Sequence, residues 1–160
     1  MRVLPLAVSV LLLVSPAARA KDLRKRVAVG VESSVGAPLL SVRAGLPMPS
    51  PVVNVLVEGL AGFSTGTDAV PSGGTVGVRL LYGIVAEDNM NLYGSAGMGW
   101  TSRTEGGALW IQPALSVECF PFGLENLGLS IAWGVQVDLG SPSGVATWGA
   151  GPGLGARYWF

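Results

Sequence analysis

The sequence predicts an all-β fold, an eight-stranded antiparallel up-and-down transmembrane β-barrel. Apolar residues alternate with small or polar ones along most of the chain, which is the period of a strand with one apolar face. Only 12% of the 160 residues are charged and the mean hydropathy is +0.52, whereas soluble domains carry about 25% charge. So few charged side chains could not cover a surface that is exposed to water. We therefore expect the apolar strand faces to contact lipid.

The N-terminal residues have the pattern of a secretory signal peptide. A positive start at Met1–Arg2 precedes an apolar core, and Ala18–Ala20 matches the small-residue cleavage pattern of signal peptidase. The apolar core has only about 12 residues, whereas a membrane-spanning helix needs about 20. We therefore predict that residues 1–20 are a signal peptide, and an uncleaved anchor is the alternative. Residues 21–26 follow as a short basic N-terminal segment, and residues 27–160 form the barrel.

The first four strands follow from apolar residues at every second position. Segments 27–32 and 40–46 set aliphatic residues against alanine, glycine, serine and one charged residue each. Segment 53–63 opposes its apolar face with one glutamate among small and aliphatic residues. In segment 76–85 four aliphatic residues and one tyrosine share a face. Each pattern predicts a strand.

The remaining four strands differ in the clarity of their alternation. Segment 92–100 is rich in glycine and alternates weakly, and segment 109–119 sets aliphatic residues against glutamine, serine and glutamate. Segment 127–139 is the clearest, because all seven odd positions are apolar and all six even positions are small or polar. Segment 147–160 supplies the last predicted strand.

Prolines and glycines mark special positions in these strands. Pro113 and Pro152 lie inside the sixth and eighth predicted strands, where each removes a donor from the hydrogen-bond ladder. We expect a bulge there, or a register displaced by one residue. The inward-facing glycines of the last strand are expected to leave room in the lumen for Trp110 and Trp159. These glycines are Gly149, Gly151, Gly153 and Gly155.

The alternation fits a membrane barrel better than a soluble fold. A bilayer offers no hydrogen-bond partners to the backbone, so a sheet crosses it only when it is closed. In such a barrel the apolar stripe faces lipid and the alternate residues face the lumen. Eight strands enclose a lumen just wide enough for side chains to fill.

The last residues carry the most specific local signal. Leu154, Ala156, Tyr158 and Phe160 share one face. This pattern resembles the C-terminal strand of bacterial outer-membrane β-barrel proteins, whose final Phe and alternating apolar residues are read by the barrel-assembly machinery. With the signal peptide and the strand count, the chain is similar to small, porin-like Gram-negative barrels of the OmpA transmembrane type.

This resemblance extends to segments 92–100 and 117–120, which look like strands of that group. It implies a location in the bacterial outer membrane, contact with outer-membrane lipid, and delivery to the barrel-assembly machinery through the C-terminal strand. It also implies that residues 21–26 and the Phe160 end lie at the periplasmic rim.

Seven charged residues have the parity of the lumen face. They are Glu32, Arg43, Glu58, Arg79, Glu118, Asp138 and Arg157. Four acids and three bases in a narrow lumen should pair, since an isolated buried charge is costly. Glu58 and Arg79 are equally distant from the middle of the connector between their strands, so we expect them to face each other. We interpret the set as a structural plug, and a charged constriction that selects ions is the alternative.

The composition excludes several kinds of chemistry. The chain contains no His, which excludes imidazole bases and histidine metal ligands. Its single Cys119 permits neither an intramolecular disulfide nor a cysteine zinc site, and we expect it to face lipid. The formal net charge of zero gives no electrostatic footprint for nucleic acid. We interpret Glu87–Asn89 as a polar turn, and we predict no catalytic, metal or cofactor-binding residues.

These observations favour a non-enzymatic outer-membrane barrel with a structural or membrane-integrity role and a lumen filled by side chains. One alternative is a narrow pore or a lateral-gate transporter that passes small or hydrophobic solutes. Another is a secreted soluble β-sandwich that acts as a binding module.

Overall fold

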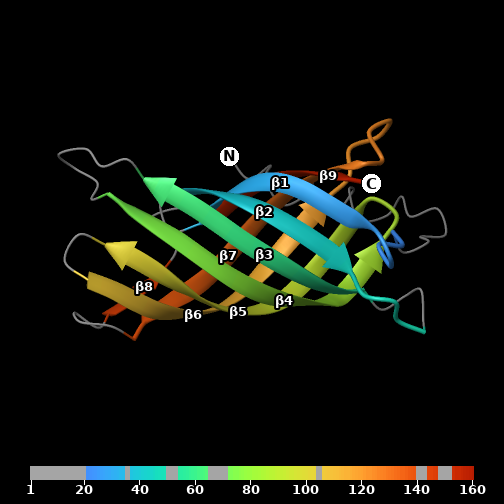
Figure 1. Ribbon diagram of the computed structural model, residues 1–160. Coiled ribbons are helices and arrows are strands. Elements are labelled where there is room, and N and C mark those ends of the chain that lie inside the picture. The colour runs from blue at the N-terminus through green and yellow to red at the C-terminus, as the bar shows by residue number, and fades with distance from the viewer. Residues whose placement is uncertain are drawn as a thin grey trace, which may run out of the picture.

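Antiparallel strands of four to fifteen residues follow one another along the chain (Figure 1). The computed structural model describes residues 21–34, 37–49, 54–64, 72–103, 106–139, 144–147 and 153–160. Its strands are β1 (Val27–Ser34), β2 (Ala37–Gly45), β3 (Val55–Ser64), β4 (Gly73–Glu87), β5 (Met90–Arg103), β6 (Gly106–Cys119), β7 (Leu127–Asp138), β8 (Gly144–Thr147) and β9 (Gly153–Trp159). Across these described ranges, no helix is long and apolar enough to cross a membrane.

The strands close into a cylinder. β1 to β7 pair in chain order, and β9 pairs with β7 on one side and with β1 on the other. β8 pairs with the end of β7, so β8 and β9 are two pieces of the eighth strand. The predicted eight-stranded antiparallel up-and-down barrel is therefore confirmed. The β-sandwich alternative is wrong, because the pairing of β9 with β1 leaves one closed sheet.

The barrel has two rims. The N/C-terminal rim carries the start of β1 and the end of β9, on the right in Figure 1, and the loop rim carries the opposite strand ends. Arg26, which directly precedes β1, joins the start of β1 to the end of β9 at the first of these rims. Its Nε donates to the backbone oxygen of Phe160 at 3.3 Å, and its Nη2 donates to the backbone oxygen of Trp159 at 3.2 Å and to Asn126 Oδ1 at 2.7 Å.

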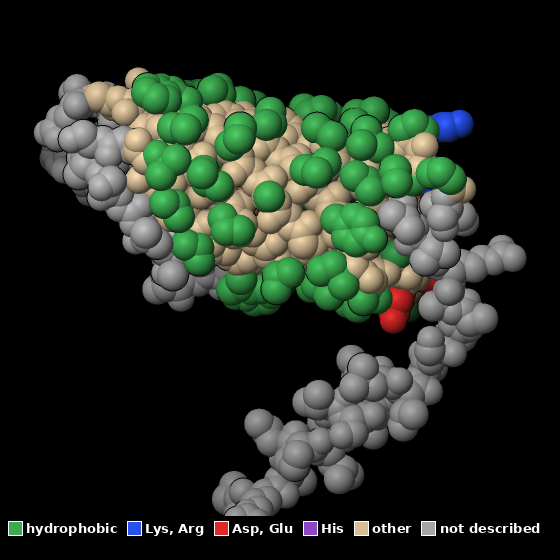
Figure 2. All heavy atoms as spheres, turned by 90° about the horizontal axis from the view of Figure 1, so that it is seen from below, with side chains coloured by type: hydrophobic (Ala, Val, Ile, Leu, Met, Phe, Trp, Pro, Cys, Tyr) green, Lys and Arg blue, Asp and Glu red, His purple; other side chains and the backbone are tan. Residues whose placement is uncertain are grey.

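The outer face of the barrel is apolar. On β4, the outward side chains from Val76 to Ile84 are 53–58% exposed, whereas Arg79 and Leu81 between them are buried. On the face drawn in Figure 2, hydrophobic side chains are spread over the wall, and the charged groups in view lie near one end. A continuous apolar surface of this kind is unusual for a soluble monomer and marks a surface that contacts a partner or a membrane.

Pro113 interrupts one ladder without changing its register. Ile111 pairs with Val137 and Ala114 pairs with Gly134, in a single register, while residues 112 and 113 have no ladder partner in β7. On the other side Pro113 pairs with Ala96 in the regular β5–β6 ladder. The expected bulge or displaced register at Pro113 is therefore wrong. The ladder instead tolerates a short gap where the proline has no N–H to donate.

The eighth strand is less regular than predicted. β8 ends at Thr147, which pairs with Val135, and β9 begins at Gly153, which pairs with Ala132, so the register against β7 shifts by three residues between the two pieces. A single continuous register over 147–160 is therefore wrong. Pro152 lies outside the described residues, as does the predicted signal peptide at residues 1–20.

The large lumen tryptophan is accommodated by different glycines from those expected. A Cβ on Gly77 of β4 or on Gly99 of β5 would overlap the ring of Trp110. A Cβ on Gly155 would instead meet Ser130 and Arg157, so the expected role of Gly155 is wrong. Gly153 is buried in the wall, and Gly149 and Gly151 lie outside the described residues.

Candidate functional site

Six of the seven predicted lumen charges meet inside the barrel, and we call them the charge cluster. Its members are Glu32 on β1, Arg43 on β2, Glu58 on β3, Arg79 on β4, Glu118 on β6 and Arg157 on β9. Each is at most 8% exposed. The strand register explains part of this, because Arg43 lies directly beside Glu58, and Glu58 lies directly beside Arg79 as their spacing predicts.

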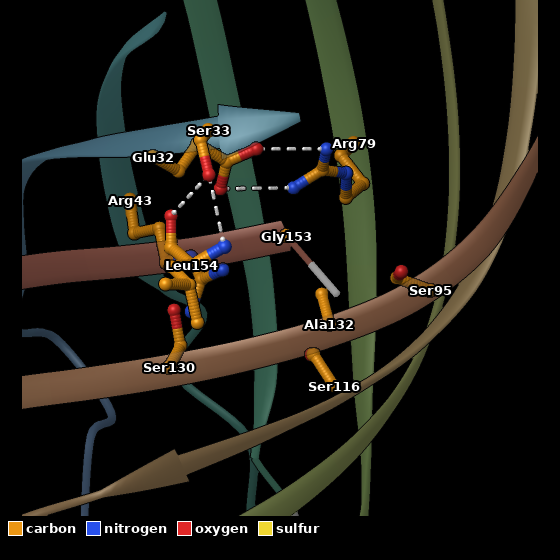
Figure 3. A pocket seen from close by; sticks show the side chains of 10 residues that line it. All are labelled: Glu32, Ser33, Arg43, Arg79, Ser95, Ser116, Ser130, Ala132, Gly153 and Leu154. Atoms are coloured by element: carbon orange, nitrogen blue, oxygen red, sulfur yellow. Dashed lines mark hydrogen bonds and ion pairs between the residues drawn. The ribbon is translucent and has the colours of Figure 1, made fainter. Parts of the chain in front are cut away.

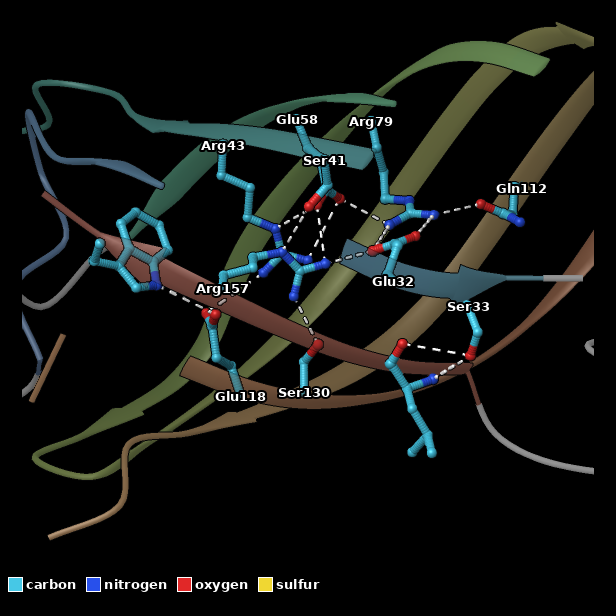
Figure 4. Close-up of polar contacts among 12 residues, drawn as sticks. Glu32, Ser33, Ser41, Arg43, Glu58, Arg79, Gln112, Glu118, Ser130 and Arg157 are labelled. Carbon is cyan, nitrogen blue, oxygen red and sulfur yellow. Dashed lines mark hydrogen bonds and ion pairs between the residues drawn. The ribbon is translucent and has the colours of Figure 1, made fainter. Parts of the chain in front are cut away.

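Glu58 is the centre of the charge cluster (Figure 4). Its carboxylate accepts hydrogen bonds from Arg43 Nε at 2.7 Å, from Arg79 Nη1 at 2.7 Å and from Arg157 Nη2 at 3.1 Å. One acid therefore neutralises parts of three bases that come from three different strands. Charge-assisted hydrogen bonds of this length are the strong class in proteins.

The two other acids, Glu32 and Glu118, connect the remaining parts of the charge cluster. Glu32 accepts from Arg79 Nη2 at 3.0 Å and also from Arg157. Glu118 accepts from Arg43 Nη1 at 3.4 Å and from the indole Nε1 of Trp159 at 3.3 Å. Three arginines and three glutamates give the cluster a formal charge of zero. Every charge in it has an opposite partner, which offsets the cost of its burial.

Neutral polar side chains that were not singled out in the sequence complete the network. Arg157 donates to Ser41 Oγ at 3.1 Å and to Ser130 Oγ at 2.7 Å, and Arg79 donates to Gln112 Oε1 at 2.7 Å. All three have lumen parity in their strands, which is the signal that could have identified them. Their partners lie on strands distant in sequence, and parity alone does not indicate a partner.

Asp138, the seventh predicted charge, lies apart from the charge cluster near the loop rim and is half-buried. It accepts a hydrogen bond from Gln136 Nε2 at 2.8 Å. Gln136 in turn accepts from Gln112, which binds Arg79. Two glutamines thus connect Asp138 to the charge cluster.

An apolar group closes the lumen at the N/C-terminal rim, and we call it the mouth plug. It consists of Leu23, Ala28, Leu56, Leu81, Tyr93, Phe120 and Trp159. Leu23 belongs to the basic segment 21–26, yet its side chain is 0% exposed. Asn54 holds this segment, since its Oδ1 accepts from the Leu23 backbone N–H at 3.4 Å and its Nδ2 donates to the Lys21 backbone oxygen at 3.0 Å.

The position of Leu23 depends on a close approach between two backbones. A Cβ on Gly45, at the end of β2, would overlap the Leu23 carbonyl oxygen. The Lys25 N–H donates to the Gly45 oxygen at 2.9 Å, and the Gly45 N–H donates to the Arg26 oxygen at 2.8 Å. The segment is thus fixed across the mouth of the barrel by main-chain bonds.

A second apolar layer lies on the loop-rim side of the charge cluster. It is formed by Leu39, Leu60 and Trp110. Along its axis the lumen therefore contains three layers, which are the mouth plug, the charge cluster and the apolar layer around Trp110. Such an arrangement can tie the strands together across the lumen and obstruct passage along it.

The described residues contain no group of three or more His, Cys, Asp or Glu side chains that could hold a metal ion. Cys119 is exposed at the end of β6. Glu87 ends β4 and Met90 begins β5, so Asp88 and Asn89 form a two-residue turn, as the sequence predicts.

Comparisons with known proteins give a match in structure but not in sequence. No protein-family model matches the chain, and no curated protein sequence matches it. Its structure is similar to the N-terminal β-barrel domain of OprF from Pseudomonas aeruginosa, with a TM-score of 0.62 and 15% identity, over 86% of this chain and 98% of that one. The two barrels share one fold.

A second solved structure, Ail, the attachment invasion locus protein of Yersinia pestis, matches with a TM-score of 0.43 and 15% identity, over 84% of this chain and 94% of that one.

Proposed function

We propose that this chain is an integral β-barrel protein of the bacterial outer membrane, with a non-enzymatic structural role and a lumen closed by its own side chains. The observation that carries the proposal is the separation of chemistry between the two barrel faces. Outward side chains of the strands are exposed and apolar, while the charge cluster lies inside. A closed sheet with this separation suits a bilayer, because the ladders leave no unpaired sheet edge and hydrocarbon covers the apolar face.

The three lumen layers support a structural role over a pore. The charge cluster is neutral and its members bind one another, so it offers no uncompensated charge to attract an ion. The mouth plug and the layer around Trp110 place apolar side chains on either side of it. An eight-stranded barrel has little interior space beyond that needed for its side chains.

The outer-membrane proposal includes two partners. Outer-membrane lipid would contact the outward side chains of all strands. The barrel-assembly machinery would read the last strand, where Leu154, Tyr158 and Phe160 are exposed on the outer face and Ala156 is half-buried beside them. Residues 1–20 are proposed to act as the export signal and to be removed.

Membrane fractionation with conductance measurement tests the structural role. We expect the protein in outer-membrane fractions, soluble only with detergent, and showing no steady conductance when refolded into planar bilayers. Protein that remains monodisperse in plain buffer would contradict the membrane assignment. A steady ohmic conductance that changes in Arg79→Ala would instead support the pore alternative.

Deletion of Phe160 tests the proposed assembly signal. We expect the truncated protein to be lost from outer-membrane fractions, and to lack the heat-modifiable migration of a folded barrel. Leu124→Ala serves as a matched control, because Leu124 is also exposed at the N/C-terminal rim but lies in the β6–β7 turn. Normal folding of the truncated protein in the membrane would contradict this part of the proposal.

A further inference from the structure

A small polar cavity lies inside the barrel, between the charge cluster and the wall made by β5, β6 and β7 (Figure 3). Its lining includes Glu32 and Arg79 on the cluster side, together with the hydroxyl-bearing residues Ser95, Ser116 and Ser130. The cavity has a volume of about 10 Å³. A buried water molecule needs roughly 10–15 Å³ of such space.

Ser116 is the residue that this cavity leaves without a partner. It lies in the middle of β6 and is 5% exposed, and its Oγ makes no hydrogen bond to any described residue. Its ladder neighbours are Tyr93 on β5 and Ala132 on β7. A buried hydroxyl without a partner is unfavourable, because it has lost its bonds to water and gained none in return.

Other polar groups of the lining still have bonding capacity. Ser130 Oγ accepts from Arg157 Nη1 at 2.7 Å, which leaves its own hydrogen to donate. Glu32 Oε1 accepts one bond, from Arg79 Nη2 at 3.0 Å, and can accept another. Ser95 Oγ donates to the Ala114 oxygen at 3.3 Å, which leaves its lone pairs to accept. A ligand in the cavity could therefore both donate and accept.

We propose that this cavity binds a single water molecule that hydrogen-bonds to Ser116 and connects it to the charge cluster. The volume excludes a larger solute. The charge cluster beside the cavity is neutral as a whole and its members are paired with one another, so it leaves no net charge to select an ion. Water is the neutral molecule of this size that is both donor and acceptor.

The water would have a specific structural role. β5 contributes no member of the charge cluster. β6 contributes only Glu118, which lies between Ser116 and the N/C-terminal rim. Gln112 of β6 already bonds to Arg79, and a bound water would add Ser116, four residues further along β6, to the polar network. It would link this part of β6 to β1 and β4, which carry Glu32 and Arg79.

The substitution Ser116→Ala tests the proposal, because a bound water and a dry cavity predict opposite changes in stability. If water is bound, the substitution removes a formed hydrogen bond, and the midpoint of urea unfolding of the protein refolded into lipid vesicles should fall. If the cavity is dry, the same substitution removes an unsatisfied hydroxyl, and the midpoint should rise. Ser130→Ala is the control, because it removes a bond to Arg157 in either case and should lower the midpoint.

A crystal structure of the unmodified protein tests the proposal without any variant. We expect one ordered water within hydrogen-bond distance of Ser116 Oγ, and its loss in Ala132→Val, which adds two methyl groups to the lining. An empty cavity in the unmodified protein, or a raised midpoint in Ser116→Ala, would overturn the proposal.

Discussion

The inner and outer faces of the barrel are built from the same strands, but they impose different demands on the sequence. On β4, Val78 and Leu80 face outward and more than half of each side chain is exposed, whereas Arg79 between them is 3% exposed and bonded to two glutamates. The outer positions need only to be apolar. The inner position needs particular partners at hydrogen-bond distance.

This difference predicts that the inner face tolerates substitution less than the outer face does. Inside, removing one charge leaves others buried without a partner. Outside, exchanging one aliphatic residue for another leaves the contact with hydrocarbon almost unchanged. The predictions below test this contrast, beginning with the largest expected effect.

The largest loss of stability is expected from Glu58→Ala. It would leave Arg43, Arg79 and Arg157 without their shared acceptor, and breaking a buried pair in this way costs about 3–5 kcal/mol. Urea unfolding of the protein in lipid vesicles, followed by tryptophan fluorescence, measures the change. Glu125→Ala is the matched control, since the Glu125 side chain is 85% exposed. Equal midpoints for the two variants would show that the charge cluster does not stabilise the barrel.

A slightly smaller loss is expected from Leu23→Ala in the mouth plug. Truncation of a buried leucine costs about 2–5 kcal/mol, depending on how far the site can collapse. This site lies at the end of the barrel, so we expect the lower half of that range. The same unfolding measurement checks it. Lys25→Ala, in the same segment but with an exposed side chain, should change stability by less than about 0.5 kcal/mol.

If Leu23→Ala and Lys25→Ala behaved alike, segment 21–26 would not be part of the folded barrel. A loss of stability in Leu23→Ala alone would instead show that the inner face of the barrel includes the segment that precedes β1.

The outer face should be sensitive to charge but not to shape. Val78→Arg places a charge near the middle of β4, and a cation near the bilayer midplane costs about 2–4 kcal/mol in a membrane barrel. Val78→Leu should be nearly neutral. Unfolding midpoints in vesicles measure both effects. If Val78→Arg were as stable as Val78→Leu, this face would not contact hydrocarbon.

The smallest effect is expected at the surface of the N/C-terminal rim. The Arg24 guanidinium donates to Asp22 and lowers the pKa of its carboxyl below the usual value of about 3.9. The pair therefore stabilises the fold at neutral pH, and this contribution is lost as the pH falls through the lowered pKa. Because the pair is exposed, solvent screens it and its contribution is small.

Comparison of the unmodified protein with Asp22→Asn at two pH values tests this contribution. The difference in unfolding free energy should be present at pH 7 and shrink toward pH 2. A difference that grew on acidification would contradict the assigned sign.

The sequence predicted the faces of the strands well, because the side-chain period of a strand is a local property. Segment 127–139 shows this, with Leu129, Ile131 and Trp133 exposed and Ser130 buried as their parity predicts. The same parity correctly predicted that the six members of the charge cluster face the lumen. It could not predict that Glu58 would bind three arginines, because their lengths and directions matter as well as their strands.

Other features escaped prediction because they depend on contacts between distant backbones. Leu23 enters the lumen only because Gly45 lacks a side chain, and Trp110 lies where Gly77 and Gly99 leave space. Nothing in the local pattern of segment 21–26 indicates that one of its residues is buried. From the sequence, the ladder gap at Pro113 could not be distinguished from a bulge, because the missing N–H of proline can cause either.

The bonds of Arg26 have a consequence for how the cylinder opens. Arg26, ahead of the first strand, bonds to the end of the last one, in addition to the ladder that pairs β1 with β9. Fraying of either strand end at this rim would therefore remove bonds that the other strand end also uses. Loss of the Arg26 guanidinium would remove its bonds at this rim while the β1–β9 ladder remains, so we expect local fraying and no opening of the ring.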